Sequence, residues 1–449
     1  MNGSMIVDHT KIGAAFRRLS LPVALQLLGD QLLGTVDTIA IGSLGTIALA
    51  GATAANTVVL VLLFTVSGLI SGTAIVAAQR IGANDLDGYG RTVRAGAVAP
   101  LVLGALWILL AFFFAAPTLH WMIGDLRSAP ASATYLILRC ISLLPISLSG
   151  TLIVGIGAAG NQRLGVLVLV VVNLIHIPLL AILGLGWLTH HPFGIVGAGI
   201  SSLLSETIAA AFAILWVVRR PQYRVFRERA ISWPIAATCA RLGFPEMIFL
   251  LGVSIPDVFI VAMLAPLGAI FVAAFRALNV VSDLTFVVPS PLQNTAQIVI
   301  GQRLGARDPQ GARWFLERAL RASLIITSLT AVGMALLAWP LAYIFTLNAA
   351  VASIAALPLA LHMLTLPLKG WAMVSLAPIR ASGDTRFSMT VGLASSALVI
   401  PLAWAGIERL HLALYSVPLG WIAAWTVRAL LTQWKLRNGA WMRSAPLAA

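Results

Sequence analysis

The chain has 449 residues, of which 59% are hydrophobic and 10% are charged, and its formal net charge is +14. Soluble globular proteins carry about 25% charged residues, so this composition excludes a soluble domain, a disordered chain and a fibre. The two cysteines, Cys140 and Cys239, are too few to form a disulfide scaffold.

The apolar runs of the chain predict membrane-spanning helices. Each run has about 20 residues or more, the length that a helix needs to cross the hydrocarbon of a bilayer, whereas the strands of an outer-membrane barrel have about ten. Twelve runs follow one another at 19–42, 50–79, 94–117, 132–157, 164–187, 193–218, 242–265, 269–302, 316–340, 351–380, 387–407 and 411–434. The second and eighth helices are long enough to tilt or protrude. The sequence therefore predicts an all-α polytopic membrane protein with twelve transmembrane helices.

The basic residues predict the orientation of these helices. Most of the 29 Lys and Arg residues lie before the first run, between even and odd runs, or at the C-terminal end, whereas the opposite loops and their flanks hold Arg127, Arg276 and Arg409. By the positive-inside rule we expect a multi-pass protein of the inner membrane with both termini cytoplasmic. The net charge thus reflects topology, and no nucleic-acid partner is expected. The Arg219–Arg229 stretch is a candidate contact for anionic membrane lipids.

An internal repeat divides the chain into two halves. A shift of 223 residues aligns Arg18 with Arg241 and AQRIGANDLDG (78–88) with GQRLGARDPQG (301–311), without a gap between them. Each half has six predicted helices, an even number, so the halves should have the same orientation. The repeat predicts two pseudo-symmetric six-helix bundles, an N-terminal lobe at 1–218 and a C-terminal lobe at 242–449, joined by a basic cytoplasmic linker at 219–241. A substrate path between two such lobes is typical of transporters.

Several segments together carry a resemblance to a known family: LSLPVALQLLGDQLLGTVDTIAIGSLGTIALAG (19–51), the two repeated loops, AAGNQR (158–163), NLIHIPLL (173–180) and GAGISS (197–202). Over essentially its whole length the chain resembles the multidrug and toxin extrusion (MATE) family. The resemblance implies a V-shaped fold of two lobes that exports organic solutes in exchange for H⁺ or Na⁺. The wider superfamily includes flippases, so the alternative function is a flippase for a lipid-linked or amphipathic precursor.

The resemblance also implies a cation-coupling site in the N-terminal lobe. The aspartate of the first helix, the asparagine of the fifth and the threonine of the sixth correspond to Asp37, Asn173 and Ser202. The fifth-helix acid of the family corresponds to Ile177, which removes half of the carboxylate charge. A second cation site that some members have in the C-terminal lobe is not expected, since Lys369 stands where helix ten would carry an acid.

A polar stripe on the first helix contains the residue that we favour as the coupling carboxylate. Gln26, Asp30 and Asp37 share one face, with two turns between the aspartates. A carboxylate that is shielded from water can take up and release a proton, and we assign this role to Asp37. The alternatives are that Asp37 caps a helix break near Gly42 and that Asp30 merely hydrogen-bonds to Gln26.

Two further residues of the first half have alternative roles. Glu206 lies one turn beyond Ser202, where it either completes the coupling site in place of the acid missing at Ile177 or forms a structural ion pair with Arg139. His176 is adjacent to the implied site and is either a proton relay or, as lone histidines more often are, a packed side chain. Proton coupling is favoured over sodium coupling, because the site has few hard oxygen ligands unless Glu206 faces it.

Charged and polar side chains inside predicted spans face a bundle interior or a wet cavity. Arg276, Asn279 and Asp283 share one face of helix eight, although Arg276 alternatively snorkels to the outer surface. Acids and bases are interspersed, which fits a polar, zwitterionic or acidic solute at least as well as a lipophilic cation. The candidates for the substrate cavity are Gln26, Asp30, Arg139, His176, Asp257, Arg276, Asn279, Asp283, His362 and Lys369.

Motifs of catalysis and cofactor binding are absent from the sequence. There is no GxxxxGK[ST] phosphate-binding loop and no HExxH, CxxC or GxSxG motif, and the seven histidines form no metal-binding pattern. We therefore expect a protein that is not an enzyme and that needs no cofactor or metal besides its coupling ion. The expected partners are a small organic solute and membrane lipids, and the expected oligomeric state is a monomer.

Overall fold

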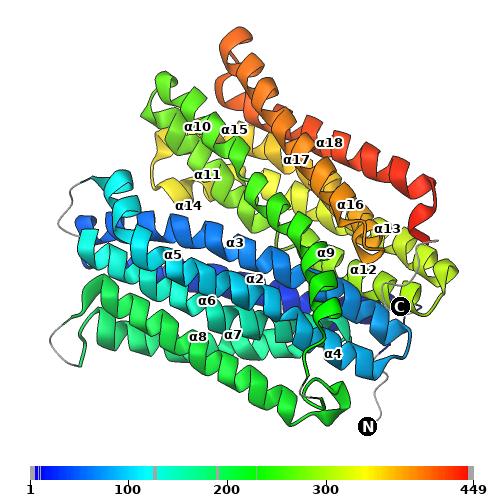
Figure 1. Ribbon diagram of the computed structural model, residues 1–449. Coiled ribbons are helices and arrows are strands. Elements are labelled where there is room, and N and C mark those ends of the chain that lie inside the picture. Colours follow the sequence, from blue (N-terminus) through cyan, green and yellow to red (C-terminus); the bar gives the residue numbers. More distant parts are fainter. Residues whose placement is uncertain are drawn as a thin grey trace. The chain divides into compact units, whose positions relative to one another are not determined.

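The computed structural model describes residues 6–8, 10, 12–124, 129–188, 192–228 and 230–442 (Figure 1). Arg127, used in the topology argument, and Arg229 of the basic stretch lie outside these residues, as do both ends of the chain, 1–5 and 443–449. The described residues are helical or irregular and include no β-strand. They therefore fit the predicted all-α class.

Within the described part of the chain, twelve helices are long and apolar enough to cross a membrane. They are Gly13–Gly42, Thr46–Gly82, Leu86–Ile123, Pro130–Ala158, Arg163–Gly184, Gly194–Val218, Trp233–Leu267, Ala269–Gly305, Pro309–Leu336, Ala349–Ala381, Thr385–Arg409 and Ala413–Arg437. The twelve predicted spans are confirmed. The third, seventh and ninth helices begin about two turns earlier than predicted. The first turns of the third and ninth are too polar to belong to an apolar run, and in the seventh Arg241 interrupts the run.

The chain packs into two compact units. The first unit contains Leu25–Met247 and the second contains Ile6–Ala24 and the chain from Ile248 onward. In the first unit α6 and α8 lie along each other (Figure 1) and share a core with α3. Its helices are α2 (Leu21–Gly42), α3 (Thr46–Gly82), α4 (Leu86–Gly96), α5 (Val98–Ile123), α6 (Ala129–Ala158), α7 (Arg163–Leu179), η2 (Leu180–Gly184), α8 (Gly194–Val218), η3 (Pro221–Tyr223) and most of α9 (Trp233–Gly252).

The second unit pairs α12 with α16 and α17 with α18, and the latter two are the orange and red helices of Figure 1. Its elements begin with α1 (Ile12–Ala15) and η1 (Phe16–Ser20). They continue with α10 (Ile255–Leu264), η4 (Ala265–Leu267), α11 (Ala269–Thr285), α12 (Pro289–Gly305), α13 (Pro309–Leu336), α14 (Ala338–Thr346), α15 (Ala349–Met363), α16 (Thr365–Ala381), α17 (Thr385–Trp404), η5 (Ala405–Arg409), η6 (Ala413–Tyr415), α18 (Ser416–Arg437) and η7 (Ala440–Met442).

The two units differ from the predicted lobes at two places. The start of the first membrane-spanning helix packs in the second unit, and the start of the seventh packs in the first unit. Residues 6–24 belong to the second unit, where Leu19 is fully buried in a hydrophobic core and Ser20 Oγ lies 2.7 Å from Thr295 Oγ1. The start of α9 belongs to the first unit, where a side chain at Gly72 would overlap with the Cys239 carbonyl. Glycine thus lets α3 and α9 approach each other closely.

The repeated loops have the same local structure in both halves. Asp85 caps α4 by accepting a hydrogen bond from the Gly88 N–H at 2.8 Å, and Asp308 caps α13 through the Gly311 N–H at the same distance. Asp85 also forms an ion pair with Arg80. A side chain at either glycine would overlap with the capping carboxylate. The spacing of the repeated motif is therefore that of an N-terminal helix cap.

Candidate functional site

The side chain of Asp37 forms a hydrogen bond to a histidine within the first unit. Asp37 Oδ1 on α2 lies 2.6 Å from Nε2 of His176 on α7. The His176 side chain is 3% exposed and the Asp37 side chain 23% exposed, so the pair is shielded but can be reached by water. This contact contradicts the alternative in which Asp37 only caps a helix, and it gives the buried His176 a carboxylate partner.

His176 is also held from its other side by α8. Its Nδ1 lies 3.5 Å from the hydroxyl of Ser205, and that hydroxyl donates to the carbonyl of Ser202 at 2.9 Å. Since the Ser205 proton is already used, its oxygen presents a lone pair to the ring, which favours a proton on Nδ1. A contact of 2.6 Å between Nε2 and the Asp37 carboxylate requires a hydrogen on one of the two atoms.

The other residues of the implied cation site do not bond to Asp37. The amide of Asn173 donates to the Leu169 carbonyl at 2.9 Å, and the hydroxyl of Ser202 donates to the Ala198 carbonyl at 3.1 Å. Both are helix-internal bonds. Ile177, at the position of the missing acid, is 42% exposed. His176, one residue earlier, takes the place beside Asp37.

Glu206, Arg139 and Asp30 add charges to the same unit. The charge of Arg139 on α6 acts on Glu206 of α8, and His176 does so more weakly. No ion pair within 4 Å joins Glu206 to Arg139 among the described residues, so the simple ion-pair alternative is not what is seen. Asp30 is exposed and interacts with the charge of Glu206. The cluster of three acids around one arginine and one histidine has an excess of negative charge.

Gln26 does not pair with Asp30 as the alternative interpretation suggested. Its side chain packs against Gly165 of α7, where a larger residue would overlap with the amide oxygen. Sequence reasoning also missed Tyr135, which is fully buried one turn before Arg139 and donates from its hydroxyl to Asn56 Oδ1 at 2.8 Å. The signal for Tyr135 and Ser205 was their position on the same helix faces as Arg139 and Ser202.

In the second unit the predicted face of α11 meets an acid of α10. Asp257 interacts electrostatically with Asn279, Asp283 and Arg276. Asp283 and Arg276 are exposed, while Asp257 and Asn279 are partly buried. The four predicted side chains therefore form one polar surface on α10 and α11.

Lys369 and His362 lie buried behind this face. His362 Nε2 lies 3.0 Å from the Ser282 hydroxyl. The ammonium of Lys369 donates to Thr285 Oγ1 at 3.2 Å and lies 3.1 Å from the centre of the Phe286 ring. These contacts are made with the last turn of α11, where helix carbonyls favour a cation.

Sequence reasoning missed Arg428, a second buried cation of this unit. Its Nε donates to the Ser395 hydroxyl at 2.8 Å, and another guanidinium nitrogen donates to Ser396 at 3.0 Å. The guanidinium also lies 4.3 Å from the centre of the Trp425 ring. The sequence signal for Arg428 is its position as a lone arginine inside the twelfth apolar run. Averaging the hydropathy over the whole run hides this single charge.

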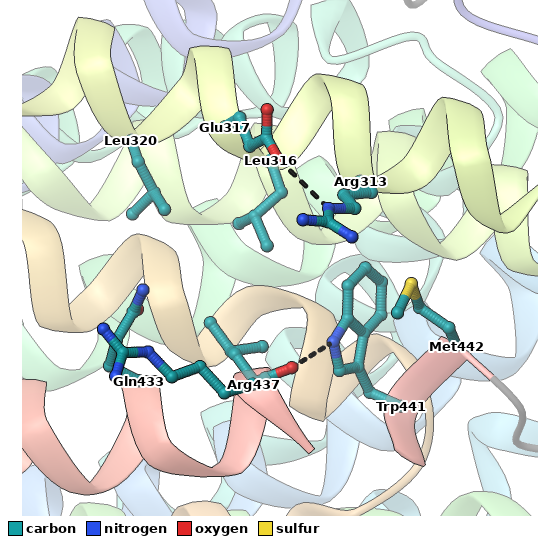
Figure 2. A pocket seen from close by; sticks show the side chains of 9 residues that line it. Arg313, Leu316, Glu317, Leu320, Gln433, Arg437, Trp441 and Met442 are labelled. Carbon is teal, nitrogen blue, oxygen red and sulfur yellow. Dashed lines mark hydrogen bonds and ion pairs between the residues drawn. The ribbon is translucent and has the colours of Figure 1, made fainter. Parts of the chain in front are cut away.

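A cavity of about 250 Å³ opens near the C-terminal end of the second unit (Figure 2). Arg313 and Glu317 on one wall are joined by a hydrogen bond of 3.1 Å, and Trp441 donates to the Leu436 carbonyl on the other. None of the predicted site residues lines this cavity. Within the described residues no three His, Cys, Asp or Glu side chains are placed to hold a metal ion.

Comparisons with known proteins cover both halves of the chain. A family model described as MatE matches residues 22–182 and 244–405. A probable multidrug resistance protein NorM of Neisseria meningitidis is 22% identical over 424 residues, which are 93% of this chain and 92% of that protein. A FAD transporter of Shewanella oneidensis is 26% identical over 349 residues, 75% of each chain.

A solved structure has the same fold. It is a MOP superfamily transporter from Pyrococcus furiosus. Its binding pocket is described as having reverse polarity, which suggests a different function for that transporter. The two chains are 20% identical and agree with a TM-score of 0.89 over 99% of each. The likeness supports two six-helix bundles as the architecture.

Proposed function

Because the chain belongs to the MatE family of transporters, we propose that it exports drug-like or polar organic solutes in exchange for protons by alternating access. Members of this family are integral membrane transporters and not enzymes. The observation that carries the proton assignment is the hydrogen bond between Asp37 and His176. One relative is named for FAD, which makes a polar solute as reasonable a substrate as a drug.

The pair suits a proton better than a sodium ion. Sodium requires several oxygen ligands around one centre, as hard cations do, but a ring nitrogen occupies the position beside Asp37. The nearby hydroxyl and amide groups of Ser202 and Asn173 donate to backbone carbonyls. A carboxylate and an imidazole can instead share one proton and release it near neutral pH.

Proton loading should control the contact between α2 and α7. With the proton bound, Asp37 and Nε2 of His176 share a short hydrogen bond of 2.6 Å. Without it, and with the other ring proton kept on Nδ1 towards Ser205, a carboxylate faces a nitrogen lone pair. Two acceptors repel each other, so release of the proton separates α2 from α7. Proton entry from outside would thus move α2, which carries Asp37, towards α7, and this movement would promote solute release.

A transport assay tests this function. Purified protein in liposomes should exchange an organic solute for protons under an imposed pH gradient, and an imposed sodium gradient should not drive the exchange. Asp37→Asn and His176→Gln should each reduce proton-driven exchange at least tenfold, because neither variant can share a proton across this contact. His120→Gln, which changes an exposed histidine of α5, is the matched control.

The outcomes separate the alternatives. Sodium-driven exchange, or unchanged exchange by both variants, would contradict proton coupling through the pair. Silence towards every soluble compound, from protein that is folded and inserted, would favour the flippase for a lipid-linked precursor. For the cell we propose an inner-membrane monomer with both termini cytoplasmic, which reporter fusions at the two ends would check.

A further inference from the structure

The second unit buries two cations in its membrane-spanning helices without burying an acid beside them. Lys369 and Arg428 are each 3% exposed. Among the described residues of this unit, no Asp or Glu side chain is buried to a similar degree. A buried charge with no carboxylate in direct contact is costly in a medium of low dielectric constant, so a membrane protein retains one where it has a use.

The surroundings of Lys369 stabilise a cation but do not neutralise it. Its ammonium donates to the Thr285 hydroxyl at 3.2 Å and lies 3.5 Å from the Ser282 carbonyl, which are both uncharged oxygens. The Phe286 ring lies 3.1 Å away and the Trp425 ring 5.9 Å away, at distances where aromatic faces attract a cation. No carboxylate of the described residues lies within 4 Å of this nitrogen. The contacts hold the charge in place and leave it available to an anion.

The residues in front of Lys369 form an accessible polar face. Arg276 and Asp283 are exposed although they lie within a membrane-spanning helix, and exposed charges at such positions border a water-filled space. Asp283 is the acid whose charge acts on Lys369. Phe286 is half-buried and follows the last residue of α11, and its ring contacts the Lys369 ammonium, so Lys369 lies at the C-terminal end of this face.

The charges of this region do not balance. The cations are Arg276, Lys369 and Arg428, whereas the acids are Asp257 and Asp283. Asp257 is engaged by the Asn279 amide and by the charge of Arg276. The three cations exceed the two acids by one positive charge, and Lys369 is the buried cation whose ammonium contacts the end of this face through Thr285 and Phe286.

We propose that Lys369 binds an anionic group, a carboxylate or a phosphate, of the solute that this transporter exports. The proposal rests on the transport function proposed above and adds the charge class of the substrate. A flexible four-carbon chain lets the ammonium reach the polar face of α11, and Phe286 and Trp425 provide aromatic surfaces beside it. Asp257 and Asp283 supply negative charge to the same face, which a cationic part of the solute would contact.

Binding measured without any ion gradient tests this proposal. The probes are 2-naphthoate, 2-naphthyl phosphate, the neutral 2-naphthamide and the cationic 2-naphthylmethylammonium, each titrated calorimetrically against the full chain in nanodiscs. We expect at least one anion to bind about tenfold or more tightly than the amide, as for one charge-assisted hydrogen bond. The two anions distinguish a carboxylate site from a phosphate site. Equal affinity for all four probes, or a preference for the ammonium, would overturn the proposal in the unaltered protein.

Three lysine variants complete the design. Lys369→Met should reduce anion affinity to that of the amide, and Lys369→Arg should keep the preference within about threefold. Lys435→Met, which removes a lysine paired with Asp384 at 2.8 Å, should have no effect. An anion preference that survives in folded Lys369→Met would also reject the site. Failure of proton coupling would leave these binding ratios unchanged, so the two proposals can fail separately.

Discussion

At the scale of single residues, some candidate side chains could be identified from the sequence, whereas their contacts with one another depend on the fold. Asp37 was predictable, because a carboxylate in an apolar run has few structural uses. The sequence placed His176 beside the implied site but could not show that its ring contacts Asp37, since that contact depends on how α7 packs against α2. Lys369 was identified as a departure from the family pattern, but its aromatic neighbours come from other helices and became visible only in the fold.

Glu206 offers a prediction at this scale. Its negative charge favours a proton on the nearby His176 ring, with which it interacts electrostatically. In Glu206→Gln this negative charge is lost, so the pH dependence of proton-driven exchange should move to lower pH. The initial rate of solute exchange between pH 5 and 9 measures the shift. Glu317→Gln, which changes an acid paired with Arg313, serves as control; an identical profile for both variants would leave Glu206 a structural residue.

At the scale of helices, the positions of most elements could be predicted from apolar runs, but their interruptions only in part. Pro256 predicts the break that separates α9 from α10. The break between α15 and α16 at Leu364 has its signal in Pro367, which has no N–H to donate to the Met363 carbonyl and whose ring crowds that carbonyl. The repeated capping loops were recognised as a motif, and the structure shows that the motif ends one helix and begins the next.

The capping loops give a prediction about stability and pH. Burial by itself raises the pKa of Asp85, but the hydrogen bonds from Arg80 and Gly88 and the charges of Arg80 and Arg91 lower it below 3.8. A carboxylate whose pKa is lowered on folding stabilises the fold above its unfolded pKa, and this contribution is lost as the pH falls through the folded value. Stability from Asp85 should therefore be constant above about pH 5 and decline below pH 4.

Asp85→Ala removes both the cap and the ion pair and should cost about 1 kcal/mol near neutral pH. Asp85→Asn keeps the cap and should lose less, while it abolishes the decline below pH 4 that comes from this residue. Thermal unfolding of the purified protein at pH 3 to 8 measures both effects, with Asp308→Ala as the equivalent variant of the second repeat. A wild-type protein whose acid dependence equals that of Asp85→Asn would contradict the assignment.

At the scale of the whole molecule, the repeat was sufficient to predict two six-helix halves, and the family match supports them. The assignment of 1–218 and 242–449 as functional lobes stays a prediction. What the sequence could not indicate is the exchange of helix starts, because residues 6–24 and 233–247 are continuous in the chain with the helices that they begin. Only the packing of Leu19 and Cys239 reveals which core each segment joins.

The exchange predicts how the chain can be divided. Fragments cut inside the 219–241 linker, such as 1–230 and 231–449, each lack one helix start that completes a unit. We expect neither fragment to be stable when expressed alone, and both to be recovered together when they are co-expressed. Co-purification through a tag on one fragment measures this, and a cut after residue 188, inside the first unit, is the comparison. A stable, monodisperse 1–230 fragment would show that the start of α9 is dispensable to the first unit.

The same exchange sets an order of events during synthesis. The segment that contains Leu19 and Ser20 leaves the ribosome early, but the residues that receive it, from Pro291 to Leu320, are made some 270 residues later. All residues of the first unit have been synthesised once Met247 is made. The second unit packs residues 6–24, which are synthesised first, with residues that are synthesised last. The start of the first helix therefore stays without its final packing partners until the second half of the chain has been synthesised.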